Sequence, residues 1–307
     1  MTKIFVTGSQ GLIGKKLCKA LVSLHIEVQE LDIALPEHEK SFGSTLDLPN
    51  LKTLMKDCDG IVHLAAVSRV IWAQQAPDRC IAINQVGTAN VLEAAKESHK
   101  KPWILFASSR EVYGQQLQFP VKEAAQFKPL NVYARSKVFG ENLVEKFRVA
   151  GFQTAIVRYS SVYGTTDDHH DRVIPAFCRA ATMGSTLRID GANNTFDFTH
   201  VDDTIAGTLK IIEQLISGEK NLPPIHLTTG KGTTLLETAQ LASHFANKEC
   251  KITEAPPRSF DVAHFIGTSL RAQSLLGWKA KIDIQQGIKQ LVLDFKKEQE
   301  EISYENS

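Results

Sequence analysis

The chain has 307 residues, and its 35 lysines and arginines nearly balance its 34 aspartates and glutamates. This balance gives no electrostatic basis for binding nucleic acid or an anionic membrane surface, and no apolar run approaches the roughly 20 residues of a membrane helix. The five cysteines are scattered without metal-ligand spacing, so we expect free thiols, a reducing cytoplasmic location and no metal site.

Short apolar runs alternate with longer amphipathic stretches through the first two hundred residues, and no signal-peptide pattern precedes the first run. The expected strands are residues 4–6, 28–31, 60–64, 103–107 and 154–159, and the expected helices are residues 12–24, 86–95 and 133–150. This alternation predicts an α/β protein with a Rossmann-type doubly wound parallel sheet and helices on both faces. Ligands of such sheets bind beyond the carboxyl ends of the strands.

The pattern changes after Gly164, where polar loops lengthen and pairs of prolines break the chain. We interpret residues 1–164 as an NAD-binding Rossmann domain, for the reasons given next, with returning sheet segments around residues 196–216. Residues 165–295 are expected to form mainly a smaller C-terminal substrate-binding lobe, interleaved with the sheet. Residues 296–307 are strongly charged, and we expect them to form a frayed tail.

A glycine-rich turn, Gly8-x-x-Gly11-x-x-Gly14, lies between the first expected strand and helix. Glycine permits a tight turn there and lets backbone amides at the helix N-terminus approach a pyrophosphate. Asp32 ends the second strand, where a carboxylate accepts bonds from a ribose 2′-hydroxyl and repels a 2′-phosphate, so NAD is favoured over NADP. The residues expected to bind the cofactor here are Gly8, Gln10, Gly11, Leu12, Ile13, Gly14 and Asp32.

Tyr133 and Lys137 lie four positions apart in an expected helix, so their side chains share one face. An ammonium beside a phenol favours the phenolate, and we expect Lys137 to lower the pKa of Tyr133 toward the working pH. The pair is therefore a candidate for proton transfer.

Further motifs follow the predicted strands. They are Asp47-Leu48, His63-Leu64-Ala65-Ala66, Asn84-x-x-Gly87-Thr88, Ser108-Ser109-Arg110-Glu111-Val112-Tyr113-Gly114, Arg158-Tyr159-Ser160-Ser161-Val162-Tyr163-Gly164, Asp197-Phe198-Thr199-His200-Val201-Asp202-Asp203 and Leu276-Gly277-Trp278. Together with the glycine turn and the Tyr133/Lys137 pair, they resemble the extended short-chain dehydrogenase/reductases, specifically the NAD-dependent nucleotide-sugar epimerase/dehydratase family, with a UDP-glucose 4-epimerase-like pattern. The resemblance runs from Met1 to about Gly287.

The resemblance implies a role for each matching residue. Ser109 would bond the reacting sugar oxygen, Tyr133 would act there as acid and base, and Lys137 would hold the nicotinamide ribose. The common chemistry begins with hydride transfer from sugar C4 to NAD, giving a transient 4-keto sugar, and the cofactor is regenerated within the turnover. By the same resemblance the further cofactor-binding residues are Asp47, Leu48, Leu64, Ala65, Ala66, Asn84, Tyr133, Lys137 and Tyr159, and the substrate-binding residues are Ser109, Arg110, Ser161, Arg172, Arg258 and Asp261.

Three functions stay open at this point. The leading prediction is a 4-epimerase of a UDP-linked or similarly linked hexose. The alternative is a lyase, either a 4,6-dehydratase or a UDP-uronate decarboxylase, because Glu111 stands where those enzymes carry a carboxylate. Glu111 could instead be a supporting group paired with Arg110, which itself replaces the aspartate usual in dehydratases. The third function, a non-catalytic nucleotide sensor, is opposed by the joint presence of Ser109, Tyr133 and Lys137.

Departures from the family pattern leave the nucleotide and the sugar open. Phe196 replaces an arginine that usually grips a phosphate, and Ser161 stands where an asparagine often contacts the substrate. Arg172 could hold a phosphate or a sugar carboxylate through paired hydrogen bonds. Family members commonly form homodimers through a four-helix bundle, and we expect the helices beginning near Asn84 and Tyr133 to supply it.

Overall fold

The computed structural model describes residues 2–305 and contains a six-stranded, fully parallel sheet. Its strands lie in the order β10-β5-β4-β3-β1-β2. Their bounds are β1 Lys3–Thr7, β2 Glu27–Leu31, β3 Gly60–His63, β4 Trp103–Ser109, β5 Thr154–Tyr159 and β10 Ile225–Leu227. The order of the strands reverses between β1 and β3, and such a reversal opens a crevice at the carboxyl ends of the strands. The predicted doubly wound sheet is therefore confirmed.

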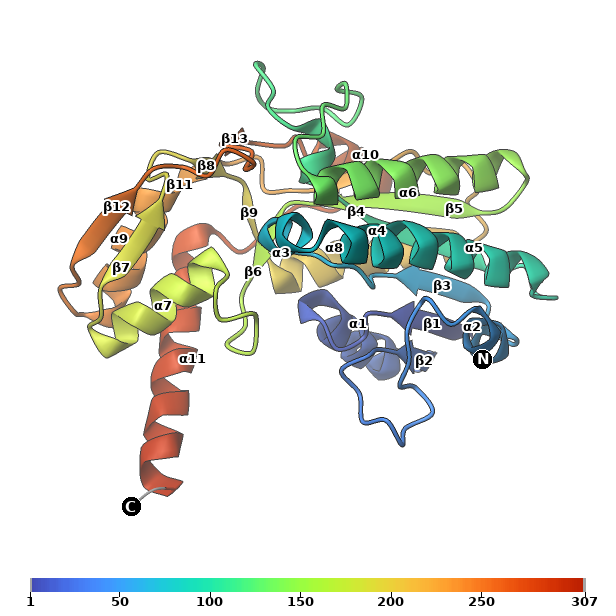
Figure 1. Ribbon diagram of the computed structural model, residues 1–307, viewed down its shortest axis with the longest axis horizontal. Coiled ribbons are helices and arrows are strands. Elements are labelled where there is room, and N and C mark those ends of the chain that lie inside the picture. The colour runs from blue at the N-terminus through green and yellow to red at the C-terminus, as the bar shows by residue number, and fades with distance from the viewer. Residues whose placement is uncertain (1, 306–307) are drawn as a thin grey trace.

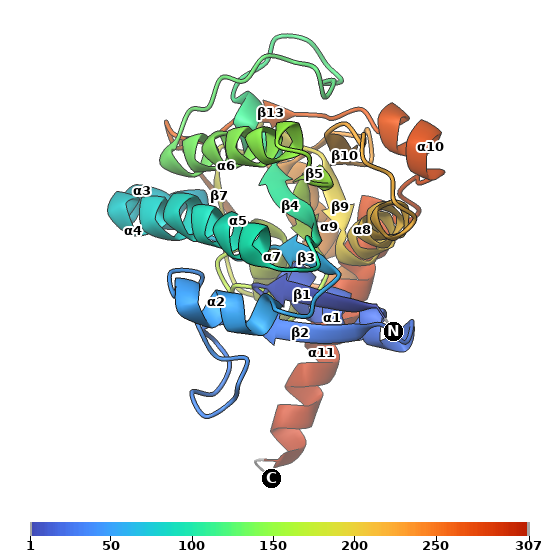
Figure 2. The same ribbon diagram turned by 90° about the vertical axis from the view of Figure 1, so that its right-hand side faces the viewer.

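Helices cover both faces of this sheet, as Figure 2 shows. On one face lie α2 (Leu48–Met55), α5 (Gly87–Glu97) and α6 (Val132–Val149), and on the other lie α1 (Leu12–Ser23) and α8 (Val201–Ile216). Each helix turns a stripe of buried apolar residues to the sheet, and this burial is the main source of the stability of the fold.

The chain between β3 and α5 is more helical than the sequence pattern predicted. It contains α3 (Val70–Gln75), α4 (Pro77–Ile81) and a π-helical turn, η1 (Ala82–Val86), which runs directly into α5. A short 3₁₀ turn, η2 (Arg110–Tyr113), follows β4. Single-turn π segments inside helices are often found at functional sites, and this one contains Asn84.

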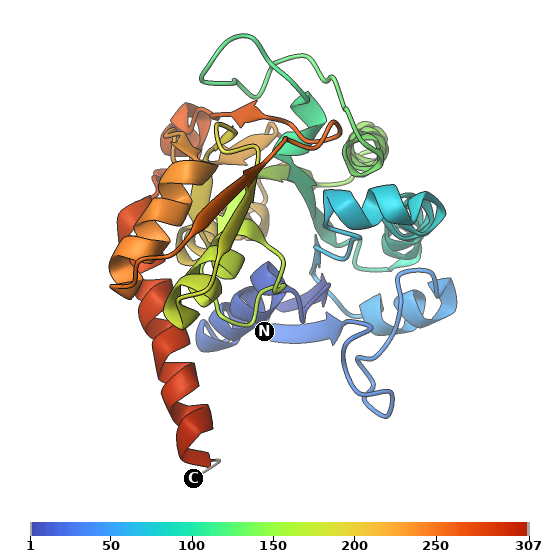
Figure 3. The ribbon, with the colours of Figure 1, turned by 60° about the vertical axis from the view of Figure 1, so that its left-hand side comes forward.

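A smaller lobe lies beside the sheet, on the left of Figure 1 and forward in Figure 3. Three helices pack together there around a separate apolar core. They are α7 (Val173–Met183), α9 (Leu235–Ala246) and α11 (Ile284–Glu305). Short strand pairs flank them: β7 (Leu187–Asp190) with β12 (Ile252–Ala255), and β8 (Thr195–Phe196) with β11 (Thr233–Thr234) and β13 (His264–Phe265).

Two expectations about the second half need correction. The segment around residues 196–216 returns mainly as helix α8 on the face of the sheet, whereas the strand that rejoins the sheet is β10. Residues 296–305 are helical as part of α11, so the expected frayed tail is wrong for them, and residues 306–307 lie outside the described part. Apolar residues of α11 as far as Phe295 pack against α7 and α9, and beyond them Glu298 accepts from Thr166 and Gln299 donates to Thr182.

The remaining elements connect the two parts. A parallel pair, β6 (Ser161–Tyr163) with β9 (Phe198–His200), lies between the sheet and the lobe, and α10 (Leu270–Leu276) packs near β10. Within residues 2–305, no helix has the length and hydropathy that crossing a bilayer requires, and no cluster of three or more potential metal ligands occurs.

Candidate active site

A cavity of about 1070 Å³ lies where the carboxyl ends of β1, β3, β4 and β5 face the smaller lobe. Most of the residues singled out from the sequence line it, so the structure brings them together from positions more than two hundred residues apart. The expected residues on its wall are Gly8, Gln10, Gly11, Leu12, Ile13, Gly14, Asp32, Leu64, Ala65, Ala66, Ser109, Arg110, Glu111, Tyr133, Lys137, Tyr159, Ser161, Arg172, Arg258 and Asp261.

The three glycine positions of the turn differ in what they would allow a side chain to do. Gly8 has φ +72°, and a Cβ on it would lie 2.7 Å from the amide nitrogen of Ala65. A Cβ on Gly14 would overlap the carbonyl oxygen of Gly8 and lie 2.8 Å from Ser9, so close packing of α1 on the turn requires glycine. A Cβ on Gly11 would meet only the Gly8 oxygen, at 3.4 Å. Protein packing therefore tolerates a side chain at position 11. That side chain would, however, obstruct a ligand that approaches the backbone there.

The groups around this turn fit a dinucleotide. Helix α1 begins at the turn with no acidic residue in its first turn, so its N-terminal amides favour an anion such as a pyrophosphate. The carboxylate of Asp32 accepts hydrogen bonds of 2.9 Å from the amide of Gln10 and 2.9 Å from the amide of Ala34, which fix it at the end of β2. That is the position from which a carboxylate reaches an adenosine ribose.

Tyr133 lies at the start of α6, where Asn131 caps the helix by accepting a 2.7 Å bond from the amide of Ala134. The phenol is hydrogen-bonded to Ser109 at the end of β4. Burial raises the pKa of Tyr133 to about 12, and the bond to Ser109 acts in the opposite direction. Tyr133 therefore rests as a neutral phenol joined to a serine hydroxyl, an arrangement that can hold the oxygen of a substrate.

Lys137 does not act on Tyr133 as the sequence suggested. Its ammonium donates a 2.8 Å bond to the carbonyl of Ala107 and lies 5.8 Å from the centre of the Tyr133 ring. Burial lowers the pKa of Lys137 to about 8. The expectation that this lysine pulls the pKa of Tyr133 down is wrong for this arrangement, because the cost of burying the phenolate outweighs every opposing charge.

Glu111 is buried beside Ser109, and both of its carboxylate oxygens are engaged. Oε1 forms an ion pair with Nη2 of Arg110 at 2.9 Å, and Oε2 accepts from Nδ2 of Asn131 at 3.1 Å. The amide of Glu111 also donates to Oγ of Ser109 at 3.2 Å. The carboxylate thus ties the end of β4 to the N-terminus of α6 and holds Ser109 and Tyr133 in register.

Asn84 lies outside the cavity wall and supports it from behind. Its side chain bonds both backbone groups of Val67, at 2.7 and 3.2 Å, and donates 2.9 Å to the hydroxyl of Ser136 on α6. Asp47 and Leu48 are also outside the wall, where Asp47 caps α2 by accepting from Asn50 at 3.1 Å. The assignment of Asp47 and Leu48 to the cofactor stays a prediction.

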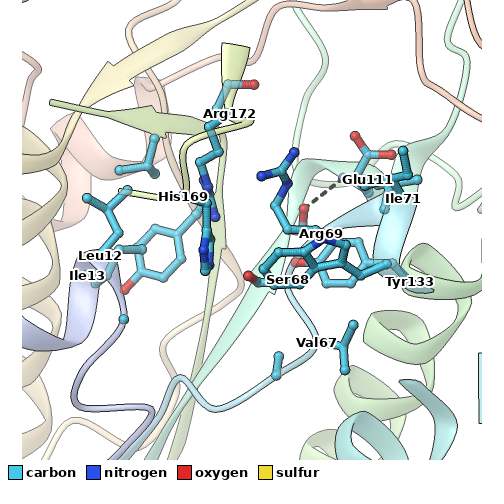
Figure 4. A pocket seen from close by; sticks show the side chains of 18 of the residues that line it. Leu12, Ile13, Val67, Ser68, Arg69, Ile71, Glu111, Tyr133, His169 and Arg172 are labelled. Carbon is cyan, nitrogen blue, oxygen red and sulfur yellow. Dashed lines mark hydrogen bonds between the residues drawn. The ribbon is translucent and has the colours of Figure 1, made fainter. Parts of the chain in front are cut away.

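The substrate end of the cavity carries several arginines. Nε of Arg172 lies 3.1 Å from the carboxylate of Asp168, and Nε of Arg258 donates 2.6 Å to Asp261. Figure 4 shows Arg172 and His169 facing Glu111, Tyr133 and Arg69 across the cavity.

Arg69 was not predicted from the sequence. It lies just beyond β3, and the position of that segment at the carboxyl edge of the sheet was the available signal.

Comparison with known proteins agrees with this geometry. Residues 4–222 match the NAD dependent epimerase/dehydratase family. A UDP-glucose 4-epimerase of Lacticaseibacillus casei is 29% identical over 307 residues, covering 91% of this chain and 92% of that protein. A UDP-N-acetyl-alpha-D-glucosaminuronate decarboxylase of Bacillus cytotoxicus is 30% identical over 274 residues, with 83% of each covered.

Among solved structures, the UDP-glucose 4-epimerase of Thermotoga maritima with UDP-glucose is 25% identical with a TM-score of 0.87. The similarity covers 97% of this chain and 100% of that chain. The similarity of fold extends over both the sheet and the smaller lobe. The chain is therefore an NAD-dependent enzyme that belongs to the NAD dependent epimerase/dehydratase family.

Proposed function

We propose that this enzyme is a UDP-sugar 4-epimerase that works through a transient 4-keto sugar. The observation that carries the proposal is the engagement of Glu111, whose two oxygens are already paired with Arg110 and bonded to Asn131. A 4,6-dehydratase needs a carboxylate free to take the proton of C5, whereas an epimerase needs only proton transfer at the C4 oxygen. Ser109 and Tyr133 together provide that transfer.

Each residue of the site has its own role in this reaction. Bound NAD supplies the hydride acceptor for C4 and a positive charge that favours ionisation of the neighbouring phenol. Tyr133 takes the proton of the C4 hydroxyl and returns it after the sugar has turned, while Ser109 holds the same oxygen throughout. Lys137, whose ammonium donates to Ala107 and lines the cavity, is assigned to a ribose hydroxyl of the cofactor. The aligned donors lower the barrier because they are in place before the reaction begins.

A lyase is the second candidate because Glu111 lines the same cavity and a decarboxylase is among the relatives. The two functions give different products. An epimerase converts UDP-glucose and UDP-galactose, or their uronates, into each other at constant mass. A lyase releases water or carbon dioxide.

The deciding experiment incubates the enzyme and NAD with each UDP-sugar and identifies products by mass and proton NMR. We expect the C4 epimer alone. Replacing Glu111 by Gln keeps the shape and one of the two acceptor oxygens, so the epimerase rate should fall less than about tenfold. A dehydratase would lose its base and at least about a hundredfold in rate. That loss, or a product of lower mass, would contradict the proposal.

We also propose a homodimer built from α5 and α6, the helices expected to form a four-helix bundle. The support is exposed apolar surface: Val86, at the end of η1 just before α5, is 50% exposed, and Phe139 of α6 is 41% exposed. Replacing Phe139 by Glu should convert a dimer into a monomer in light-scattering chromatography. A wild-type monomer would contradict this proposal.

A further inference from the structure

Arg110 lies next to Ser109 and is held in one orientation. Its guanidinium carbon stacks 4.6 Å from the centre of the Phe196 ring and 5.6 Å from that of Phe265. Nη2 lies 2.9 Å from the carboxylate of Glu111, and the side chain is only 12% exposed. Two aromatic rings and one carboxylate thus fix the guanidinium at the wall of the cavity.

This guanidinium has donors that the protein does not use. Nη1 of Arg110 is buried and makes no hydrogen bond to any of residues 2–305. An orphaned buried donor costs about 1–3 kcal/mol, more for a charged group, and calls for an explanation. The contrast with Arg158 is clear: its guanidinium donates to both oxygens of Glu141 and to the hydroxyl of Tyr113.

The other arginines of the cavity already have carboxylate partners outside the reacting centre. Arg172 is paired with Asp168, Arg258 with Asp261, and Arg69 with Asp171. Nε of Arg172, like Nη1 of Arg110, is buried and makes no hydrogen bond among the described residues, so position and not an unused donor alone distinguishes the two arginines. Among these four arginines, only Arg110 pairs with Glu111, the residue whose amide donates to Oγ of Ser109. It is therefore the cation best placed to meet a group attached close to the reacting carbon.

We propose that Arg110 binds a carboxylate at C6 of the sugar, so that the enzyme selects a UDP-hexuronate over the neutral UDP-hexose; this rests on the proposed epimerase function. Ser109 holds the C4 oxygen, and C6 is two bonds from C4, whereas the diphosphate leaves the ring on its far side at C1. A planar, permanently charged guanidinium suits a planar carboxylate. Glu111 orients the guanidinium and leaves its remaining donors for the substrate.

Such binding also keeps the reaction an epimerisation. Decarboxylation of a 4-keto uronate breaks the C5–C6 bond, and the negative charge of the carboxylate moves through C5 to the C4 oxygen. A guanidinium that holds the charge on the carboxylate stabilises the reactant more than this transition state. Arg110 would then provide both selection and protection of the keto acid.

The test compares kcat/KM for UDP-glucuronate and UDP-glucose, and for the two galacto epimers, in the NAD-loaded enzyme. We expect the wild type to prefer the uronates by about a hundredfold, and Arg110→Ala to reduce this preference to about fivefold or less, mainly by raising KM. Arg110→Lys should keep part of the preference because it keeps the charge. Arg135→Ala, which removes an exposed arginine from α6, should keep all of it.

The outcomes separate the two proposals. A wild type that prefers UDP-glucose, or an Arg110→Ala variant that loses both substrates equally, overturns carboxylate selection and leaves epimerisation standing; equal loss would identify a phosphate contact or a structural role. Release of carbon dioxide overturns the proposed epimerisation. If Arg110→Ala then loses the preference for uronates, the result still supports carboxylate binding by Arg110. If no UDP-sugar is converted, the proposed epimerisation is overturned. The role of Arg110 is then decided by thermal stability: UDP-glucuronate, but not UDP-glucose, should stabilise the wild type, and Arg110→Ala should lose this stabilisation.

Discussion

Nη1 of Arg69 lies 2.5 Å from the carboxylate of Asp171, although the two residues are 102 positions apart in the chain. Nη2 of Arg69 also donates to the main-chain oxygen of Asp171 at 3.2 Å. The same loop, residues 165–172, is held by Lys15 of α1, whose ammonium lies 2.8 Å from Asp167. Two ion pairs thus fasten this loop, which lines the cavity, to the segment after β3 and to α1.

Breaking the Arg69–Asp171 pair should speed the release of NAD. A half-buried ion pair contributes on the order of 1 kcal/mol, so Arg69→Ala and Asp171→Ala should each raise the NAD dissociation rate about fivefold. The double variant should be no faster than either single variant, because all three lose the same contact. Stopped-flow release of NAD measures this. Lys100→Ala breaks an exposed pair with Asp59 away from the cavity and should change nothing, whereas additive effects at Arg69 and Asp171 would contradict the pairing.

Gly11 and Gly14, the last two glycines of the turn, should respond differently to replacement by alanine. Gly11→Ala should fold normally and bind NAD about tenfold or more weakly, because its Cβ meets no protein atom closer than 3.4 Å but enters the space of the diphosphate. Gly14→Ala should lose thermal stability as well, since its Cβ overlaps backbone. Calorimetric binding and thermal unfolding distinguish the two. Unchanged NAD affinity in Gly11→Ala would place the diphosphate elsewhere.

Buried His63 should make the enzyme sensitive to acid. Its ring contacts the hydroxyls of Thr7 at 2.7 Å and Thr88 at 3.0 Å, and burial lowers its pKa from 6.5 to about 3. Between pH 3 and pH 6.5 the unfolded chain binds a proton at His63 and the folded chain does not. The free energy of unfolding that depends on neutral His63 is therefore fully present above pH 6.5 and decreases as the pH drops toward 3.

Replacing His63 by Gln should remove this dependence. From pH 6.5 to 5 the variant should lose about 2 kcal/mol less unfolding free energy than the wild type, measured by urea denaturation. His99→Gln, at an exposed position, serves as the control and should follow the wild type. Parallel pH profiles for His63→Gln and the wild type would show that His63 is not the group responsible.

Tyr133→Phe should reduce kcat by about 10² to 10⁴ while leaving NAD bound, because it removes only the phenolic hydroxyl. The neutral resting phenol, with its pKa raised to about 12, also predicts that activity rises with pH as ionisation becomes easier. Undiminished turnover in Tyr133→Phe would contradict the mechanism. Retained NAD absorbance in the purified variant controls for a misfolded site.

The sequence predicted the cofactor half well because its signals are local. The glycine turn, Asp32 and the Tyr133/Lys137 spacing each lie within one strand–turn–helix unit, where residue type and period determine the geometry. Strand β5 has the predicted bounds, 154–159. Boundaries elsewhere moved by one or two residues, as expected for frayed element ends.

The contacts that were missed join residues far apart in the chain. Stacking of Arg110 on Phe196 and the pairing of Arg69 with Asp171 depend on how the two lobes meet, and no local pattern encodes that. The pKa of Tyr133 was misjudged for the same reason. Spacing shows which charge is near a phenol, but the depth of burial that dominates here comes from the assembled fold.

The chain cannot be divided after residue 164 without damage to the sheet. The neighbour of β5 on its outer side is β10, which comes from residues 225–227, and α8 covers the adjoining face with Val201, Ile205 and Ile211. A truncated first half would therefore expose an unpaired strand edge beside an uncovered apolar surface, a combination that promotes aggregation. A chimera that takes residues 1–164 from a relative would therefore also need the relative's strand that corresponds to β10, because that strand pairs with β5.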